Sequence, residues 1–164
     1  MTDFARVKET FWDESAPEAR PPLTDAAVAE AERALGVRLP AALLELLRLR
    51  NGGPVSADRD AFPTTGPTSW AEDQVPLDEL LGIGHDPDRL SLLDTPYLVT
   101  EWGLPAPLVL LCGDGHCWIA LDYRRCGPRG EPSVTWFDRE REEELPLAPD
   151  FRSFVEGLTS SSPA

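Results

Sequence analysis

Residues 107–123 contain two apolar runs separated by a tight turn, and they restrict the possible folds more than any other part of the chain. Residues 107–112 form a run of strand length, and residues 117–123 are apolar on both faces as far as Asp122. The glycines of residues 113–116 allow the positive φ of a hairpin turn. A strand that is apolar on both faces must be covered on both. We therefore expect the second run to lie centrally in a sheet that has layers on both sides.

Helical patterns precede this hairpin. Apolar residues at helical spacing predict an amphipathic helix over residues 3–12. A second helix, over residues 25–35, has a natural N-cap at Thr24 and a left-handed C-terminal position at Gly36. A third helix begins at Pro40, and an Asn-Gly-Gly-Pro sequence ends it. Its leucines form too broad a stripe for one face, so we expect it to be buried on two sides.

The other segments predict shorter elements. These are mostly loop for residues 54–76, with room for a short strand, one helical turn for 76–81, a short helix for 96–102 that ends at Gly103, a third strand for 133–137, a short edge piece for 145–147, and a last helix that carries Phe151, Phe154, Val155 and Leu158. Helices first, hairpin-linked strands next and a final helix indicate an α+β fold. We expect one domain over residues 1–158 and a frayed tail over 159–164.

The chain is strongly acidic, with 15 basic and 29 acidic residues and a net charge of −14. Binding to phosphates needs clustered bases, and only Arg124, Arg125 and Arg129 come close, so we expect no direct binding to nucleic acid. There is no apolar stretch of about 18 residues for a membrane span, and residues 1–14 lack the apolar region of a secretory signal. Three cysteines fit reduced thiols better than a disulfide framework. Together these features predict a cytoplasmic protein.

The acidity is uneven. Residues 61–110 hold eight acids and one base, Arg89. Their net charge of −7 is half of the net charge of the chain. Such a segment either keeps the protein soluble or attracts a basic partner. Composition alone favours the first interpretation.

Several short motifs occur together in an order that resembles one family. They are Gly36, Leu39-Pro40 and Asn51-Gly52-Gly53 in the helix pair, Glu101-Trp102-Gly103-Leu104-Pro105, Gly113-Asp114-Gly115-His116-Cys117-Trp118 continuing to Asp122-Tyr123-Arg124, Glu131-Pro132-Ser133-Val134, and Phe151-Arg152-Ser153-Phe154-Val155. Each motif alone occurs in many folds. In order and spacing, residues 6–158 resemble the SUKH superfamily, and within it a bacterial branch of the Smi/Knr family. Cys117 departs from the pattern, where a small residue such as Thr is expected.

This resemblance implies an α+β fold with a mainly antiparallel sheet, packed by N-terminal helices and a C-terminal helix. It also implies a protein-binding module with no catalytic set, metal or cofactor. Many bacterial members are similar to immunity proteins that bind a cognate toxin, often a nuclease. The alternative is a regulatory or scaffolding module that binds a cellular protein. The signature residues from Gly36 to Tyr123 are expected to be mostly structural.

If the partner is a nuclease toxin, its active cleft should be basic. A carboxylate-rich surface could cover that cleft by imitating the spacing of phosphates. The candidate partner-binding residues are therefore Glu72, Asp73, Asp78, Glu79, Asp86 and Asp88, with Trp70 and Trp102 as aromatic anchors.

A third class of function would place chemistry at the turn of residues 113–116, as in a small hydrolase or metalloprotein. Zinc ligands could come from Cys112, His116, Cys117 and Cys126, and a nucleophile pair could be oriented by Asp114 or Asp122. The cysteine spacing is poor for zinc. Adjacent strand residues point to opposite faces, so His116 cannot easily serve Cys117. We therefore expect neither a metal site nor a catalytic pair.

Overall fold

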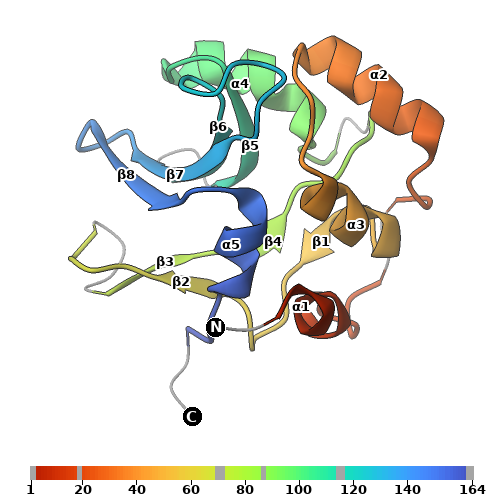
Figure 1. The fold of residues 1–164 in the computed structure, drawn as a ribbon, viewed down its shortest axis with the longest axis horizontal. Coiled ribbons are helices and arrows are strands. Elements are labelled where there is room, and N and C mark those ends of the chain that lie inside the picture. Colours follow the sequence, from red (N-terminus) through yellow and green to blue (C-terminus); the bar gives the residue numbers. More distant parts are fainter. Residues whose placement is uncertain (1–2, 18–19, 69–72, 86–87, 114–116, 162–164) are drawn as a thin grey trace.

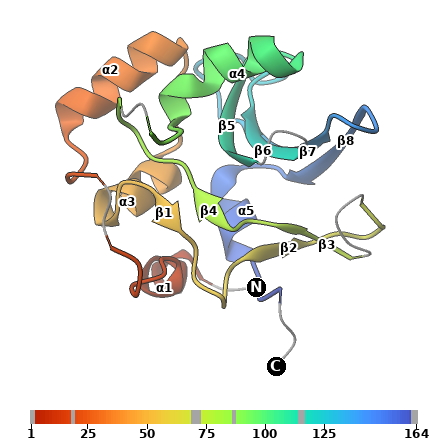
Figure 2. The same ribbon diagram turned by 180° about the vertical axis from the view of Figure 1, so that it is seen from behind.

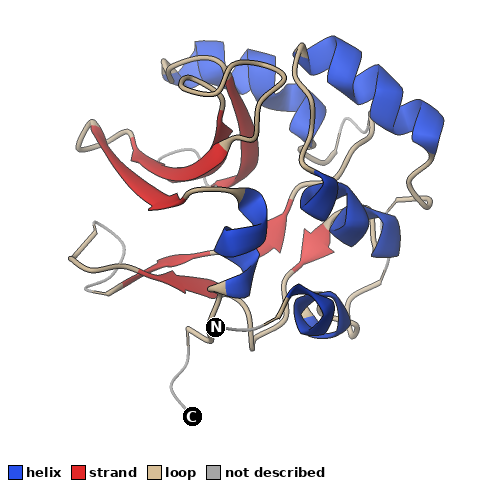
Figure 3. Ribbon diagram, viewed as in Figure 1, coloured by secondary structure: helices blue, strands red, loops and turns tan. Residues whose placement is uncertain are grey.

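The computed structural model describes residues 3–17, 20–68, 73–85, 88–113 and 117–161. Its elements are, in chain order, α1 (Phe4–Thr10), α2 (Asp25–Leu35), α3 (Ala41–Leu49), β1 (Gly53–Pro54), β2 (Ala61–Pro63), β3 (Gln74–Pro76), β4 (Glu79–Leu80), the 3-10 helix η1 (Leu92–Asp94), α4 (Thr95–Trp102), β5 (Leu108–Gly113), β6 (Cys117–Asp122), β7 (Ser133–Asp138), β8 (Glu143–Ala148) and α5 (Phe151–Glu156). Helices and antiparallel strands in separate parts of the chain make this an α+β fold, as the sequence predicts (Figure 1, Figure 3).

The main sheet has the strand order β5-β6-β7-β8, and every neighbouring pair is antiparallel. The predicted central strand is confirmed, because Ala120 of β6 pairs with Leu110 on one side and Thr135 on the other. All residues of β6 from Trp118 to Asp122 are buried. The remaining strands form two short antiparallel ribbons, β1 with β4 and β2 with β3.

The two faces of the main sheet pack against different layers. Helix α4 covers one face, where Leu98 meets Leu110, Trp118 and Phe137 in a small apolar cluster. The other face packs into the larger cluster that includes α1, α2, α3 and α5 (Figure 2). The small cluster takes residues from β5, β6 and β7 but none from β8, so β8 and its neighbourhood stay open on the α4 side.

Local signals place the helices where the sequence predicts them. Thr24 caps α2 by accepting a hydrogen bond from the Ala27 N–H, and Gly36 ends the helix with φ +71°. Helix α4 ends in the same way at Gly103, with φ +65°. Helix α1 is shorter than the predicted 3–12, because Trp12 leaves the helix to form a β-bridge with Val55.

One local expectation is wrong and two are incomplete. Residues 76–81 do not form a helical turn, because Glu79 and Leu80 pair with β1 as strand β4. Residues 54–76, predicted mostly as loop with room for a short strand, contain two hairpin strands, β2 and β3, whose pairing no local motif predicts. The edge piece predicted at 145–147 lies at the edge of the main sheet, but it is the middle of a longer strand, the six-residue β8. At the C-terminal end, Thr159 pairs with Ala61, and Ser161 bonds the Asp60 carboxylate.

Candidate functional site

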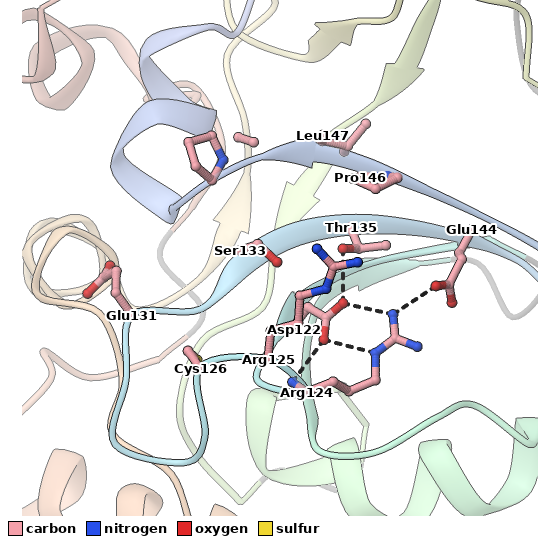
Figure 4. A pocket seen from close by; sticks show the side chains of 12 residues that line it. Asp122, Arg124, Arg125, Cys126, Glu131, Ser133, Thr135, Glu144, Pro146 and Leu147 are labelled. Carbon is pink, nitrogen blue, oxygen red and sulfur yellow. Dashed lines mark hydrogen bonds and ion pairs between the residues drawn. The ribbon is translucent and has the colours of Figure 1, made fainter.

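A pocket of about 680 Å³ lies on the open part of the sheet face, beside the loop between β6 and β7 (Figure 4). It is lined by Asp122, Arg124, Arg125, Cys126, Glu131, Ser133, Thr135, Glu144, Pro146, Leu147, Ala148 and Pro149. We call it the sheet pocket. From the sequence, Asp122 and Cys126 are considered for chemistry and Arg124 and Arg125 for phosphate binding, but they are not brought together there, because nothing local indicates that β8 lies beside β7 and brings Glu144 toward Arg124.

An ion-pair network forms the floor of the sheet pocket. Asp122 is only 8% exposed and accepts hydrogen bonds from the Arg124 backbone N–H (3.0 Å), the Arg124 Nε (3.0 Å), the Arg124 Nη2 (2.8 Å) and the Thr135 hydroxyl (3.2 Å). Arg124 Nη2 also donates to Glu144 across the sheet at 3.0 Å. The guanidinium lies over the Phe137 ring, 5.5 Å from its centroid. Arg124 is therefore fixed in one orientation and ties β6, β7 and β8 together.

The network determines the charge states of its members. Burial alone would raise the pKa of Asp122, but the hydrogen bonds and charge of Arg124 outweigh burial and hold the pKa below its usual value. The carboxylates of Asp122 and Glu144 in turn raise the pKa of Arg124. Both groups are thus charged at neutral pH. The pairing neutralises most of the charge in the pocket, which suits a binding or structural surface.

The sheet pocket holds one thiol, Cys126. Burial of its sulfur raises the pKa of Cys126, and the nearby carboxylates of Asp122 and Glu131 raise it further. A thiol with a raised pKa is protonated at neutral pH and is a weak nucleophile. The geometry therefore gives no activated cysteine here.

The other two cysteines lie elsewhere. Cys112 and Cys117 line a second pocket, of about 270 Å³, together with Asp78, Glu79 and Trp136. The structure thus separates Cys126 from Cys112 and Cys117, the other two cysteines that the sequence offers as zinc ligands. Within the described ranges, no group of three or more His, Cys, Asp or Glu side chains is arranged to hold a metal ion. His116 and Asp114 lie outside the described residues, as does Gly115.

The structure places part of the predicted acidic surface together. Asp78 and Glu79 line the pocket beside the cysteines, and Glu79 and Asp88 line a further pocket of about 230 Å³. All three side chains are exposed, and we call them the acidic rim. Asp73 is also exposed, but it immediately precedes β3, at the end of the β2–β3 ribbon that is farther along the chain from Asp78. It is therefore not part of the rim. Glu72, Asp86 and Trp70 lie outside the described residues.

Trp102, the other predicted anchor, is 38% exposed at the end of α4. Its backbone carbonyl accepts a hydrogen bond from Arg139 at 2.9 Å, which joins α4 to the end of β7. Glu101 beside it is exposed.

Several signature residues connect segments that are distant in sequence. The Asn51 amide donates to the Ile83 carbonyl and accepts from the Ile83 N–H, both at 2.8 Å and both buried. Gly52 has φ +89°, and a Cβ there would lie 2.6 Å from the Gly82 nitrogen, so the two backbones touch only because both residues are glycine.

The remaining signature contacts surround the α2–α3 connection. The Tyr123 hydroxyl donates to the Arg38 carbonyl at 2.6 Å, and the Leu39 N–H donates to the Glu32 carboxylate at 2.8 Å. Pro40 precedes α3 at its N-cap.

Two signature glycines act elsewhere in the fold. Gly113, where an added Cβ would collide with the Trp118 ring, lets that indole pack across the hairpin. Gly53 continues the turn after Gly52 with φ +144°. These contacts build the fold.

Comparison with known families agrees with this architecture. The model of the SMI1 / KNR4 family (SUKH-1) matches residues 22–157, and the chain belongs to that family. A comparison with curated proteins gives no match. The family points to a protein-interaction module and is generally non-catalytic. No helix among the described residues is both long and apolar enough to cross a membrane.

Proposed function

We propose that this chain is an immunity protein that binds a basic toxin domain, often a nuclease in such systems, and blocks its active cleft. Membership of a family of interaction modules supports the general role. The specific observation that carries the proposal is the acidic rim, three exposed carboxylates beside two pockets in a protein of net charge −14. A basic cleft would be attracted to this rim over a distance of about 10 Å at moderate salt.

Hydrogen bonds hold the backbone that carries Asp78 and Glu79 of the rim. Glu79 belongs to β4, which pairs with β1, and the Val55 N–H donates to the Asp78 carbonyl at 2.9 Å. The two carboxylates therefore extend from a hydrogen-bonded backbone and not from a free loop. Binding to such a segment needs less ordering of the backbone.

The test is affinity purification of the tagged chain from its native host at low and at moderate salt, followed by identification of the bound protein. We expect a basic domain that dissociates as salt rises and that stops growth when it is expressed without this chain. A stable partner that is harmless on its own would overturn the immunity role and favour a regulatory module.

A matched pair of variants tests the rim itself. D78N/E79Q removes two rim charges, and E140Q/E142Q removes two charges from the β7–β8 turn. We expect the rim variant to slow association about three- to tenfold at low salt and to flatten its salt dependence, because exposed charges act mainly on the association rate. Equal association rates for the two variants would show that the rim does not steer the partner.

A further inference from the structure

A groove of about 880 Å³ lies between α1 and α3, which are neighbours in both views (Figure 1, Figure 2). We call it the helix groove. Its lining residues include Ala5, Lys8, Glu9 and Trp12 from α1 and the residues after it, and Glu45, Arg48 and Leu49 from α3. None of the sequence signals for partner binding falls in this groove.

The positive charges of the helix groove are already paired within the protein. Lys8 pairs with Glu45 at 3.3 Å, and Arg48 pairs with Asp25 at 2.6 Å. Arg50 is buried and donates to the carbonyls of residues 13, 16 and 17. Among the described residues, the exposed carboxylates of Glu9 and Glu14 have no hydrogen-bond or ion-pair partner. The groove is lined by three bases and three acids, and the exposed charges that have no partner among the described residues are the carboxylates of Glu9 and Glu14.

The helix groove also exposes an apolar anchor point. Leu49 is 54% exposed, whereas Leu43, Leu46 and Leu47 of the same helix are fully covered. Trp12 also lines the groove; it is only 8% exposed, and its indole is held in place because Nε1 donates to the Leu46 carbonyl at 3.0 Å. A fixed aromatic floor with an exposed leucine next to it matches the way an apolar side chain of a helix is received in a groove.

The family match covers α3 but begins after α1. The helix groove is thus formed by one helix inside the matched region and one helix outside it. A substitution in α1 can change this surface without any change to the matched region.

We propose that the helix groove binds a basic amphipathic helix of the partner, with an apolar side chain on Leu49 and Trp12 and Lys or Arg beside Glu9 and Glu14. This inference rests on the proposed function, that the chain binds a basic protein. Hydrogen bonds connect the backbone segments that carry the two surfaces: Asp13 N–H donates to the Pro54 carbonyl at 3.1 Å, and Val55 N–H donates to the Asp78 carbonyl at 2.9 Å. We expect the charges of the rim to act on association and the apolar anchor to act on dissociation.

The probe is a stapled helical peptide of about 15 residues, with leucines on one face and lysines elsewhere, compared with a scrambled peptide of the same composition. NMR of the labelled full chain should show shifts at Ala5, Glu9 and Leu49. We expect L49Q and E9K/E14K each to weaken binding about tenfold, and the scrambled peptide to bind weakly. The controls L90Q, a second exposed leucine, and E140K/E142K should stay within about twofold.

Shifts that map to the acidic rim, or equal affinity for L49Q and wild type, would overturn the helix groove. A wild-type dimer that L49Q converts to monomer would also overturn it, because the groove would then hold a second copy of the chain. The two proposals fail separately. If the captured toxin is neutralised equally by L49Q, with an unchanged dissociation rate, the groove is wrong and the immunity role stands. If no toxin exists but the peptide maps to the groove, the immunity role fails and the groove stands.

Discussion

Replacement of Asp122 by Asn tests whether the network under the sheet pocket holds the outer strands together. The carboxylate accepts four hydrogen bonds, two at each oxygen. In D122N one oxygen can still accept from the Arg124 N–H and Nε, and the Thr135 hydroxyl can rotate to accept from the new amide NH₂, but Arg124 Nη2 faces another donor. The charged bond from Nη2 is lost and the other bonds to Arg124 lose their ionic character, at about 2–3 kcal/mol together. We expect a loss of about 2–3 kcal/mol in unfolding free energy, with a fall in Tm of about 5–10 °C.

The assay is urea denaturation of wild type, D122N, R124M and the double variant, with the m-value checked for constancy. The cycle should give a coupling energy of about 1–3 kcal/mol between Asp122 and Arg124. The control is E45Q, because the Lys8–Glu45 pair is exposed and should contribute at most about 0.5 kcal/mol. A D122N cost no larger than that of E45Q would refute the claim that this network stabilises the sheet.

The same variant has a predicted pH signature. The pKa of Asp122 is lower in the folded chain than in the unfolded chain. Its stabilisation is therefore fully present above the unfolded pKa of about 4 and is lost as pH falls through the lower folded value. The stability difference between wild type and D122N should be constant from about pH 5 to 8 and should shrink below about pH 4. A difference that grows on acidification would contradict the sign of this linkage.

Two further substitutions test the contacts of the signature residues, and a labelling experiment tests the thiol. N51A leaves the buried N–H and carbonyl of Ile83 unpaired and should lower the unfolding free energy by about 2–4 kcal/mol in urea denaturation. Y123F removes the hydroxyl bond to the Arg38 carbonyl and should cost about 1–1.5 kcal/mol in the same assay. Because its pKa is raised, Cys126 should react with iodoacetamide more slowly than free cysteine at pH 8, as mass spectrometry of a C112S/C117S background would show.

The sequence predicts the helices and the central hairpin well because their signals are local. A capping Thr, a glycine in the left-handed conformation and an apolar run on both faces of a strand each act within a few residues, and α2, α4 and β6 follow them closely. The ribbons are missed for the opposite reason. Two-residue strands such as β1 and β4 exist only through pairing between residues about 26 apart in the chain, and no local pattern specifies such a pairing.

The same distinction explains why the candidate surfaces were only partly predicted. The acidic rim could be proposed from composition because Asp78, Glu79 and Asp88 are close in sequence. The helix groove could not, because its charge depends on which cations are already paired, and Lys8–Glu45 and Arg48–Asp25 join residues from different elements. The net charge of −14 gives the total excess of acidic residues. Which of the carboxylates a partner can bind depends on the ion pairs that they form within the protein.

This difference bears on how such a family can change partners. The contacts of Asn51, Gly52 and Tyr123 are buried or backbone-directed, so they constrain the fold and say nothing about the partner. The rim and the helix groove lie outside those contacts, on the β1–β4 ribbon, the loop after it and the exposed faces of α1 and α3, where charges and one exposed leucine can change at little cost to the core. Partner choice in this chain should therefore reside in residues whose replacement alters binding rates while leaving the unfolding free energy almost unchanged.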